Sequence, residues 1–318
     1  MSLPHDALQA SYAVCHRMTR RSGSSFYSSF LLLDKPRRRA MEAVYAFLRY
    51  TDDLADGPAP ASVRRDALAR WRFAIAEALP GGLGFVGPGL RPPGPKNTYG
   101  DVGLNGQSDG LLLLPALADV CQRFHVPVEH LFAVLDGVEM DLQERRYRTF
   151  DELMEYCDRV ASAVGLVCIH LWGFRGQGAF GPVRCCGRAF QLTNILRDVK
   201  EDADRGRVYL PMEDLARCGY SPGELVRGLA DERFDQLMNL QIDRAGELFR
   251  QGVLLFDWLD RPGRRIFGMM ASTYARLLAI IARRPRSVLE RRVTLPWGTR
   301  LWLAARWALL PARRPRLP

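Results

Sequence analysis

The sequence predicts an all-α fold, and three observations support this prediction. Apolar residues recur at helical spacing in six segments, strand-like alternation is scarce, and the 47% hydrophobic content is spread evenly over 318 residues. With 25% charged residues and ordinary glycine and proline totals, the composition excludes a coiled coil, a collagen-like chain or a wholly disordered protein. We therefore expect a globular, helical chain.

The expected helices span residues 36–54, 63–79, 128–142, 150–172, 183–199 and 234–259. In each, apolar residues stand three or four positions apart, as one face of a helix requires. Asp151 and Glu152 favour the start of the fourth helix, because acidic side chains stabilise a helix N-terminus. Pro211 lies beyond the end of the fifth, and Ser221-Pro222 is typical of a further helix start.

Residues 80–110 interrupt this pattern. They are dense in glycine and proline without apolar periodicity, so we expect a loop within a single domain that spans residues 1–318. The lack of periodicity favours a disordered loop, and a lid is the alternative. Gly82, Gly84 and Gly87 spell the G-x-G-x-x-G pattern of dinucleotide sites. That pattern needs a preceding strand and a following helix, whereas here a helix precedes and prolines follow. The loop is therefore not expected to bind a nucleotide.

Charge and cysteine content narrow the function classes. The 45 basic residues exceed the 35 acidic ones, which favours an anionic partner. Nucleic acid is not expected, because aromatic residues are not interleaved with the arginines. Seven cysteines without a C-x-x-C pair indicate reduced thiols and a cytoplasmic chain.

No stretch reaches the roughly 18 apolar residues of a membrane span. Residues 301–310, with Trp302 and Trp307 amid arginines, fit either a last helix packed on the domain or an amphipathic helix on the inner membrane surface.

The first informative segment is an acidic stripe. At about 100° per residue, one sector of a helix holds Tyr45, Arg49, Asp52, Asp53 and Asp56. The rest of that helix is largely apolar, which predicts burial on most sides. A solvated acidic face remains the alternative.

The second informative segment also carries polar side chains along one face of an expected helix. Gln191, Asn194, Asp198 and Asp202 stand three, four and four positions apart, beside an apolar flank. Amides and carboxylates on so apolar a helix are costly to bury unless a cation satisfies them.

Carboxylates four residues apart suit Mg²⁺, which takes oxygen ligands and is commonly held by one or two carboxylates together with substrate phosphates. Basic residues beside both stripes offer contacts to phosphate oxygens: Arg49 near the first, and Arg197, Lys200, Arg205 and Arg207 near the second. The expected anion is a diphosphate.

With these residues the chain resembles the squalene and phytoene synthase family from about residue 22 to 293. The most specific stretches are residues 24–27, 45–56, 137–141, 156–165 and 191–211. The resemblance implies a single α-helical isoprenoid-synthase domain around a central cavity, Mg²⁺ dependence and prenyl diphosphate substrates.

Carried over by position, the resemblance makes Asp52, Asp53 and Asp56 the first metal-binding motif, and Asp198 with Asp202 the second. It implies that further side chains contact diphosphate or support the metal ligands: Arg49, Gln191, Asn194, Arg197 and Arg207. Tyr45, Tyr156 and Tyr209 match family tyrosines near the reacting carbons, although core aromatics with satisfied hydroxyls are the alternative.

The resemblance implies loss of diphosphate from one substrate, attack by the double bond of a second, and proton loss to close a cyclopropane. The proton acceptor is either the departing diphosphate or a tyrosine hydroxyl. Several segments look most like the bacterial presqualene diphosphate synthase branch, which uses farnesyl diphosphate, and phytoene synthases are similar in the same places.

No nicotinamide site is recognised, so the reaction is expected to stop before reduction, without NADPH. A non-catalytic assembly factor of the same fold is the alternative of another class. Protein partners are not indicated by the sequence.

Overall fold

The computed structural model describes residues 5–22, 27–86, 107–143 and 145–315. Within these ranges no strand forms, and one isolated bridge joins Phe174 to Leu259. The all-α prediction is confirmed. Residues 24–26 of the family-like segment and residues 87–106 of the glycine- and proline-rich loop lie outside the described residues.

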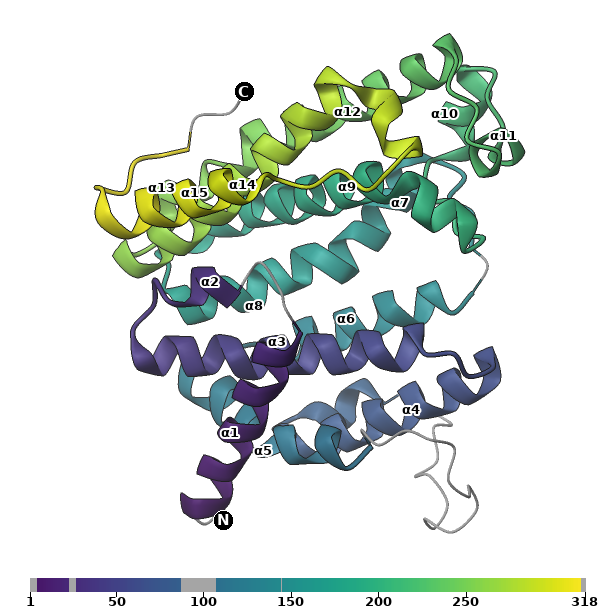
Figure 1. Ribbon diagram of the computed structural model, residues 1–318. Coiled ribbons are helices and arrows are strands. Elements are labelled where there is room, and N and C mark those ends of the chain that lie inside the picture. Colours follow the sequence, from purple (N-terminus) through teal and green to yellow (C-terminus); the bar gives the residue numbers. More distant parts are fainter. Residues whose placement is uncertain (1–4, 23–26, 87–106, 144, 316–318) are drawn as a thin grey trace. The chain divides into compact units, whose positions relative to one another are not determined.

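The chain divides into two compact units, Met1–Leu142 and Gln143–Pro318, and the expected single domain spans both. The helices of the first unit are α1 (His5–Arg21), α2 (Tyr27–Phe30), α3 (Lys35–Asp56), α4 (Ala61–Ala78), α5 (Gln107–Phe124) and α6 (Glu129–Asp141) (Figure 1). Those of the second are α7 (Phe150–Cys157), α8 (Ala163–Trp172), α9 (Phe180–Asp204), α10 (Met212–Arg217), α11 (Pro222–Val226), α12 (Glu232–Gly252), α13 (Leu255–Trp258), α14 (Arg261–Arg283) and α15 (Trp297–Leu309).

Helix α3 lies at the centre of the first unit, in contact with α1, α4, α5 and α6. Its start is fixed by Asp34, whose side chain accepts a hydrogen bond from the backbone N–H of Arg37 at 3.0 Å. Further along, the Trp71 indole of α4 donates to the Thr51 hydroxyl at 3.0 Å, so this buried polar group is satisfied. These contacts fix the helix that carries the first acidic stripe.

The ends of the expected loop carry helical structure. A 3₁₀ turn, Gly82–Phe85, follows α4, and the Phe85 ring stacks on Phe132 of α6 with centroids 4.9 Å apart. Helix α5 already begins at Gln107. Gly82 and Gly84 thus lie in a turn after a helix, and no strand precedes them among the described residues. A dinucleotide site of this pattern requires a strand before the glycines, and here helix α4 stands in that place.

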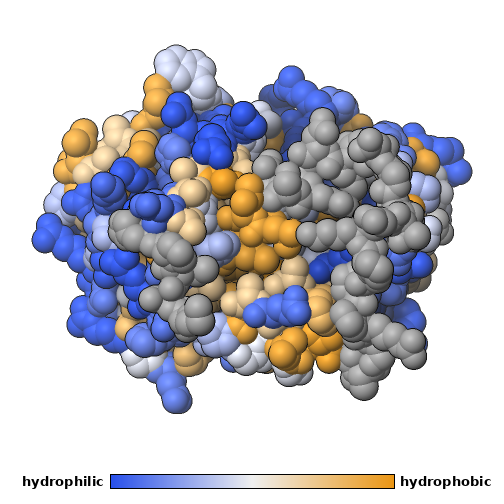
Figure 2. Space-filling view, turned by 90° about the horizontal axis from the view of Figure 1, so that it is seen from below, coloured by the Kyte–Doolittle hydropathy of each residue, from blue (hydrophilic) through white to orange (hydrophobic). Residues whose placement is uncertain are grey.

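Apolar side chains also remain on the surface of the first unit. Leu83, Leu111 and Leu112 are exposed, the last two in the first turns of α5. Figure 2 shows apolar side chains gathered near the centre of the face seen from below, among polar ones. Apolar atoms make up more than half of the accessible surface of a typical folded protein, so exposed leucines by themselves indicate no function.

Helix α9 is the core of the second unit and packs against α8, α12 and α14. Two glycines let backbones approach closely there. A Cβ on Gly187 of α9 would lie 2.6 Å from Ser162 Cα, and a Cβ on Gly252 of α12 would lie 2.7 Å from Cys186 Cα. Both clashes would be with backbone atoms, which cannot swing aside.

Replacing Gly187 with alanine is therefore expected to destabilise the protein by about 1–3 kcal/mol, although alanine is the better helix former. Gly246→Ala on α12 is the matched control, because nothing lies within 4 Å of its added Cβ. That variant should be neutral or stabilised by up to about 1 kcal/mol. Chemical denaturation monitored by circular dichroism measures both, and equal midpoints would contradict the close approach.

Two of the expected helices are interrupted. The helix expected at 150–172 contains a π-helical turn, Asp158–Ser162, between α7 and α8. Asp158 accepts hydrogen bonds there from Arg188 Nε and Ser162 Oγ, each at 2.8 Å. The helix expected at 234–259 ends at Gly252, and α13 begins at Leu255. The interruption follows the glycine that packs against α9.

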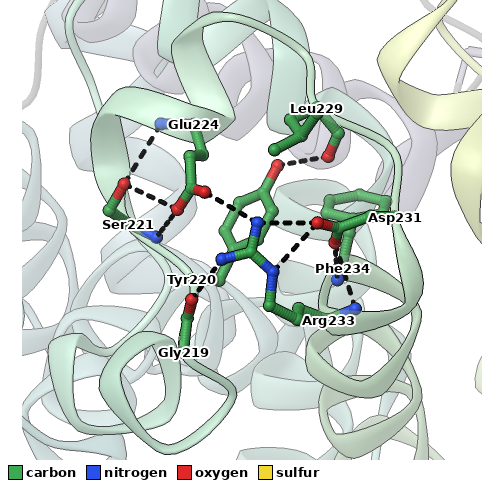
Figure 3. Close-up of polar contacts among 8 residues, drawn as sticks. All are labelled: Gly219, Tyr220, Ser221, Glu224, Leu229, Asp231, Arg233 and Phe234. Atoms are coloured by element: carbon green, nitrogen blue, oxygen red, sulfur yellow. Dashed lines mark hydrogen bonds and ion pairs between the residues drawn. The ribbon is translucent and has the colours of Figure 1, made fainter.

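The corner before α12 is held by a polar network (Figure 3). The Arg233 guanidinium pairs with Glu224 at 2.8 Å and with Asp231 at 2.7 Å, and Tyr220 Oη donates to the Leu229 carbonyl at 2.6 Å. Ser221 and Glu224 form a capping box, which confirms the helix start expected at Ser221-Pro222. This corner directs α12 back along α9.

Helix α14 is long and apolar enough to cross a membrane by length and composition, which the sequence analysis did not detect. However, 56% of the relevant window is buried inside the fold, as in the core helix of a globular protein. All seven cysteines are free thiols, and five of them are buried.

Candidate functional site

The first acidic stripe lies at the C-terminal end of α3. Asp52, Asp53 and Asp56 are exposed, while the neighbouring Thr51, Leu54 and Ala55 are buried. Arg49 pairs with Asp53, with Nη2 and Oδ1 2.7 Å apart. The stripe is therefore an accessible row of carboxylates on a helix whose other sides are packed.

The surroundings of Asp52 disfavour its charged form. Burial among the surrounding atoms is the first cause, the Asp56 charge adds to it, and together they raise the pKa of Asp52 to about 7. Asp53 and Asp141 contribute in the same direction, whereas Arg49 lowers it. The side chain itself remains exposed to solvent. A carboxylate crowded by like charges is stabilised by a nearby cation.

Asp141 is a residue that the sequence analysis did not assign to the site. It ends α6, and its carboxylate is close enough to Asp52 to affect the pKa of that group. Only the packing of α6 on α3 brings the two together. The sequence did contain one indication of this role, because Asp141 belongs to residues 137–141, one of the stretches most similar to the family.

The second stripe lies along α9, where Gln191, Asn194, Asp198 and Asp202 are all partly buried. Asn194 Nδ2 lies 3.5 Å from Gln191 Oε1. The amide oxygen of Asn194 is buried without a hydrogen-bond partner among the described residues. A buried acceptor without a partner is rare in folded proteins and calls for a bound ion or water. It stands one turn before Asp198.

Asp198 is held by two arginines. Arg197 Nε donates to Asp198 Oδ1 at 2.8 Å, and Arg292 Nε lies 2.9 Å from the same oxygen. Arg292 follows the 3₁₀ turn Pro285–Leu289 and was not among the sequence candidates. In the sequence it is one of many paired arginines, and no spacing rule links it to α9.

The remaining basic candidates surround the end of α9. Arg207 lowers the pKa of Asp202, and its backbone N–H donates to the Asp202 carbonyl at 2.8 Å. Arg205 pairs with Glu201 at 3.0 Å, and Lys200 pairs with Asp204. Arg205 also lowers the pKa of Asp202, but less than Arg207 does.

Tyrosines form a cluster in the second unit. The rings of Tyr156 and Tyr209 stack with centroids 5.3 Å apart, and Tyr147 lies 5.5 Å from Tyr156. Tyr147 was missed because it lies in an irregular segment, which the hydrogen bond from Met212 N to its carbonyl brings beside Tyr209. Tyr45, in the first unit, packs 6.1 Å from Phe30.

The donor set fits a hard divalent cation that is completed by substrate. Among the described residues, no group of three or more acidic, histidine or cysteine side chains lies together as a protein-only metal centre. Mg²⁺ commonly uses one or two carboxylates and takes its other oxygens from water and substrate phosphates. Asp198, Asp202 and the free oxygen of Asn194 match that requirement, and so do the carboxylates of α3.

The pH dependence of stability tests the electrostatics of the second stripe. Burial first, and then the Asp198 charge, raise the pKa of Asp202 to about 7. Below the unfolded pKa of about 4, Asp202 is protonated in both states and does not reduce the free energy of unfolding. As pH rises from about 4 to about 7, the unfolded state loses this proton more readily than the folded state, so the free energy of unfolding falls. The asparagine of Asp202→Asn does not titrate. In EDTA, the thermal midpoint of this variant minus that of the parent protein should therefore become more positive between pH 4 and 8. A constant difference across this range would contradict the raised pKa.

Comparisons with known proteins match the sequence of this chain to one family. A family model described as squalene/phytoene synthase matches residues 19–299. The chain is 32% identical to a 15-cis-phytoene synthase from Synechocystis, over 96% of this chain and 86% of that protein. It is also 32% identical to a phytoene synthase from Mycobacterium tuberculosis, over 91% of this chain and 87% of that protein.

Solved structures show the same fold. A dehydrosqualene synthase superposes with a TM-score of 0.76 and 26% identity, covering 96% of this chain and 98% of that one. A squalene synthase from Alicyclobacillus acidocaldarius superposes with a TM-score of 0.74 and 23% identity, covering 90% and 97%. The second match is evidence for the fold alone.

Proposed function

Because the chain belongs to the squalene/phytoene synthase family, whose members condense prenyl diphosphates head to head, we propose that it joins two molecules of one prenyl diphosphate with Mg²⁺ as cofactor. The observation that carries this proposal is the stripe on α9. There an unpartnered amide oxygen of Asn194 precedes two carboxylates, and the pKa of one of them, Asp202, is raised.

The two stripes would hold the metal ions through Asp52, Asp53 and Asp56 on α3 and through Asp198 and Asp202 on α9. Bound Mg²⁺ would neutralise the diphosphate, so that the C–O bond breaks and the diphosphate leaves with the bonding electron pair. Arg49, Arg197 and Arg207 would bind diphosphate oxygens, with Gln191 and Asn194 orienting the ligands. Binding diphosphate requires Arg197 to share or exchange its contact with Asp198.

The aromatic side chains would act on the carbon skeleton. Loss of diphosphate leaves an allylic cation, which the double bond of the second substrate attacks before proton loss closes a cyclopropane. The rings of Tyr156 and Tyr209, which stack on each other, would stabilise this cation through a π face. The hydroxyls of Tyr45, Tyr156 and Tyr209 and the departing diphosphate are the proposed proton acceptors.

Two substrate lengths are supported by different observations. Phytoene synthases 32% identical over nearly the whole chain favour geranylgeranyl diphosphate. The motif resemblance to presqualene diphosphate synthases and the dehydrosqualene synthase structure, at 26% identity, favour farnesyl diphosphate. The reaction is proposed to end at the condensed product without NADPH.

Product analysis tests the proposal. The purified full chain is incubated with Mg²⁺ and either farnesyl or geranylgeranyl diphosphate, each with and without NADPH, and products are identified by mass spectrometry. A thirty-carbon or a forty-carbon product identifies the substrate, and a product that changes with NADPH would refute the proposed end point. No turnover of either substrate would refute the proposal and favour the non-catalytic alternative.

A further inference from the structure

One side of α15 attaches this helix to the second unit. Leu303 and Trp307 are buried, and the Trp307 ring fills the space above Gly268 of α14, where a Cβ would come within 2.1 Å of it. Arg265 of α14 donates to the Trp307 carbonyl at 3.1 Å and to that of Ala308. The helix is therefore docked, and its other side is held facing outward.

That outward side is apolar. Trp297, Leu301 and Leu309 are 75%, 56% and 79% exposed, and Trp302 is 54% exposed. At about 100° per residue these side chains fall in one sector of the helix. The same sector holds further exposed small residues: Gly298, Ala305 and Ala308. A helix on a water-exposed surface normally turns charged residues outward, whereas this one turns out tryptophan and leucine.

Arginines border the apolar sector. On a helical projection Arg300 falls on one side of it and Arg306 on the other. Between α14 and α15 lies a groove of about 550 Å³, whose lining includes Arg276, Arg306 and Arg313. None of the described residues that line this groove is acidic. From residue 291 onward the sequence contains no aspartate or glutamate.

An exposed apolar sector bordered by arginines fits one kind of partner better than the others. A second copy of the chain would bring the same basic border against itself, which like-charge repulsion disfavours. Nucleic acid would satisfy the arginines but not the exposed tryptophan and leucine. The boundary between headgroups and acyl chains of an anionic bilayer satisfies both, because tryptophan concentrates there and arginine pairs with phosphate.

We propose that the outward side of α15 binds an anionic lipid bilayer, with Trp297, Leu301 and Leu309 among the acyl chains and a headgroup phosphate in the arginine groove. The Arg276 guanidinium, which lies 4.7 Å above the Trp302 ring and lines this groove, would pair with that phosphate. The inference goes beyond the proposed condensation and does not depend on it. The residues of this surface lie on α14, α15 and the segment after α15, and the residues proposed for condensation on α3 and α9 are not part of it.

Vesicle flotation of the full chain tests this surface. The parent protein should float with vesicles of phosphatidylcholine and phosphatidylglycerol, and much less with phosphatidylcholine alone. Leu301→Glu should weaken binding about tenfold or more, because a charge replaces buried apolar surface. Leu112→Glu, at a leucine of α5 that is 51% exposed, is the matched control and should bind as the parent does.

A second pair of variants tests the charge. Arg313→Glu should weaken binding to the anionic vesicles about tenfold, and Arg217→Glu on α10 should leave it unchanged. Failure of the parent to float, equal binding by Leu301→Glu, or a dimer in light scattering that Leu301→Glu dissociates would each overturn the inference. Turnover measured in detergent for the same variants reports on the proposed condensation separately.

Discussion

Asp198→Asn is expected to reduce turnover about 10³-fold while leaving the fold intact, because on the proposed mechanism it removes a charged oxygen ligand of the Mg²⁺ ion that neutralises the departing diphosphate. The substituted amide has nearly the same shape and can still accept a hydrogen bond from Arg197 Nε. Steady-state kinetics with Mg²⁺ and the preferred prenyl diphosphate measure the loss, and a thermal melt verifies the fold.

Asp204→Asn is the matched control on the same helix. Asp204 is exposed and pairs with Lys200 one turn away, off the stripe that holds Asp198 and Asp202. Exposed pairs of this kind contribute about 0.5 kcal/mol or less to stability, so both turnover and the thermal midpoint should stay close to those of the parent. Retained activity in Asp198→Asn would remove that residue from the mechanism, and an inactive Asp204→Asn would show that the stripe alone does not define the site.

Arg244→Ala is expected to cause the largest loss of stability, about 3–5 kcal/mol, by leaving a buried carboxylate unpaired. Asp214 is only 2% exposed and accepts hydrogen bonds from Arg244 Nη1 at 2.5 Å and from Gln241 Nε2 at 2.8 Å. The guanidinium also lies 4.1 Å above the Phe150 ring. One side chain thus ties α10 and α7 to α12, the helix that supports α9.

Arg250→Ala provides the comparison for that measurement. Arg250 lies on the same helix and pairs with Glu247, but both side chains are more than half exposed, 66% and 52%. Its loss should cost about 0.5 kcal/mol or less. Denaturant midpoints followed by circular dichroism compare the two variants. Equal midpoints would mean that the Asp214 carboxylate regains solvent or another partner when Arg244 is removed.

Local spacing was enough to predict both acidic stripes. The i, i+3 and i, i+4 repeats depend only on the geometry of a single helix, and the structure places every member of each stripe on one helix, α3 or α9. The same rule identified the all-α class. It could not foresee the π turn at Asp158, because that turn depends on Arg188, which lies 30 residues away in the sequence.

Residues outside the stripes were harder to find from sequence. Asp141 affects Asp52 only because α6 packs on α3, and Arg292 reaches Asp198 across 94 residues of chain. Tyr147 lies beside Tyr156 and Tyr209 because its carbonyl accepts a hydrogen bond from the backbone N–H of Met212, 65 residues later at the start of α10. None of these contacts has a periodicity that a sequence can display.

The sequence by itself determined the helical class, the two acidic helices and the family, because these follow from local spacing and from motifs carried on contiguous residues. The tertiary structure decided which charges surround those carboxylates, since burial and like-charge proximity are properties of packing. The tertiary structure also decided which face of the last helix, α15, packs on the protein and which face is exposed. Residues 301–310 fitted either a packed or a lipid-facing helix, and only the burial of Leu303 and Trp307 on α14 determined which side of α15 faces outward.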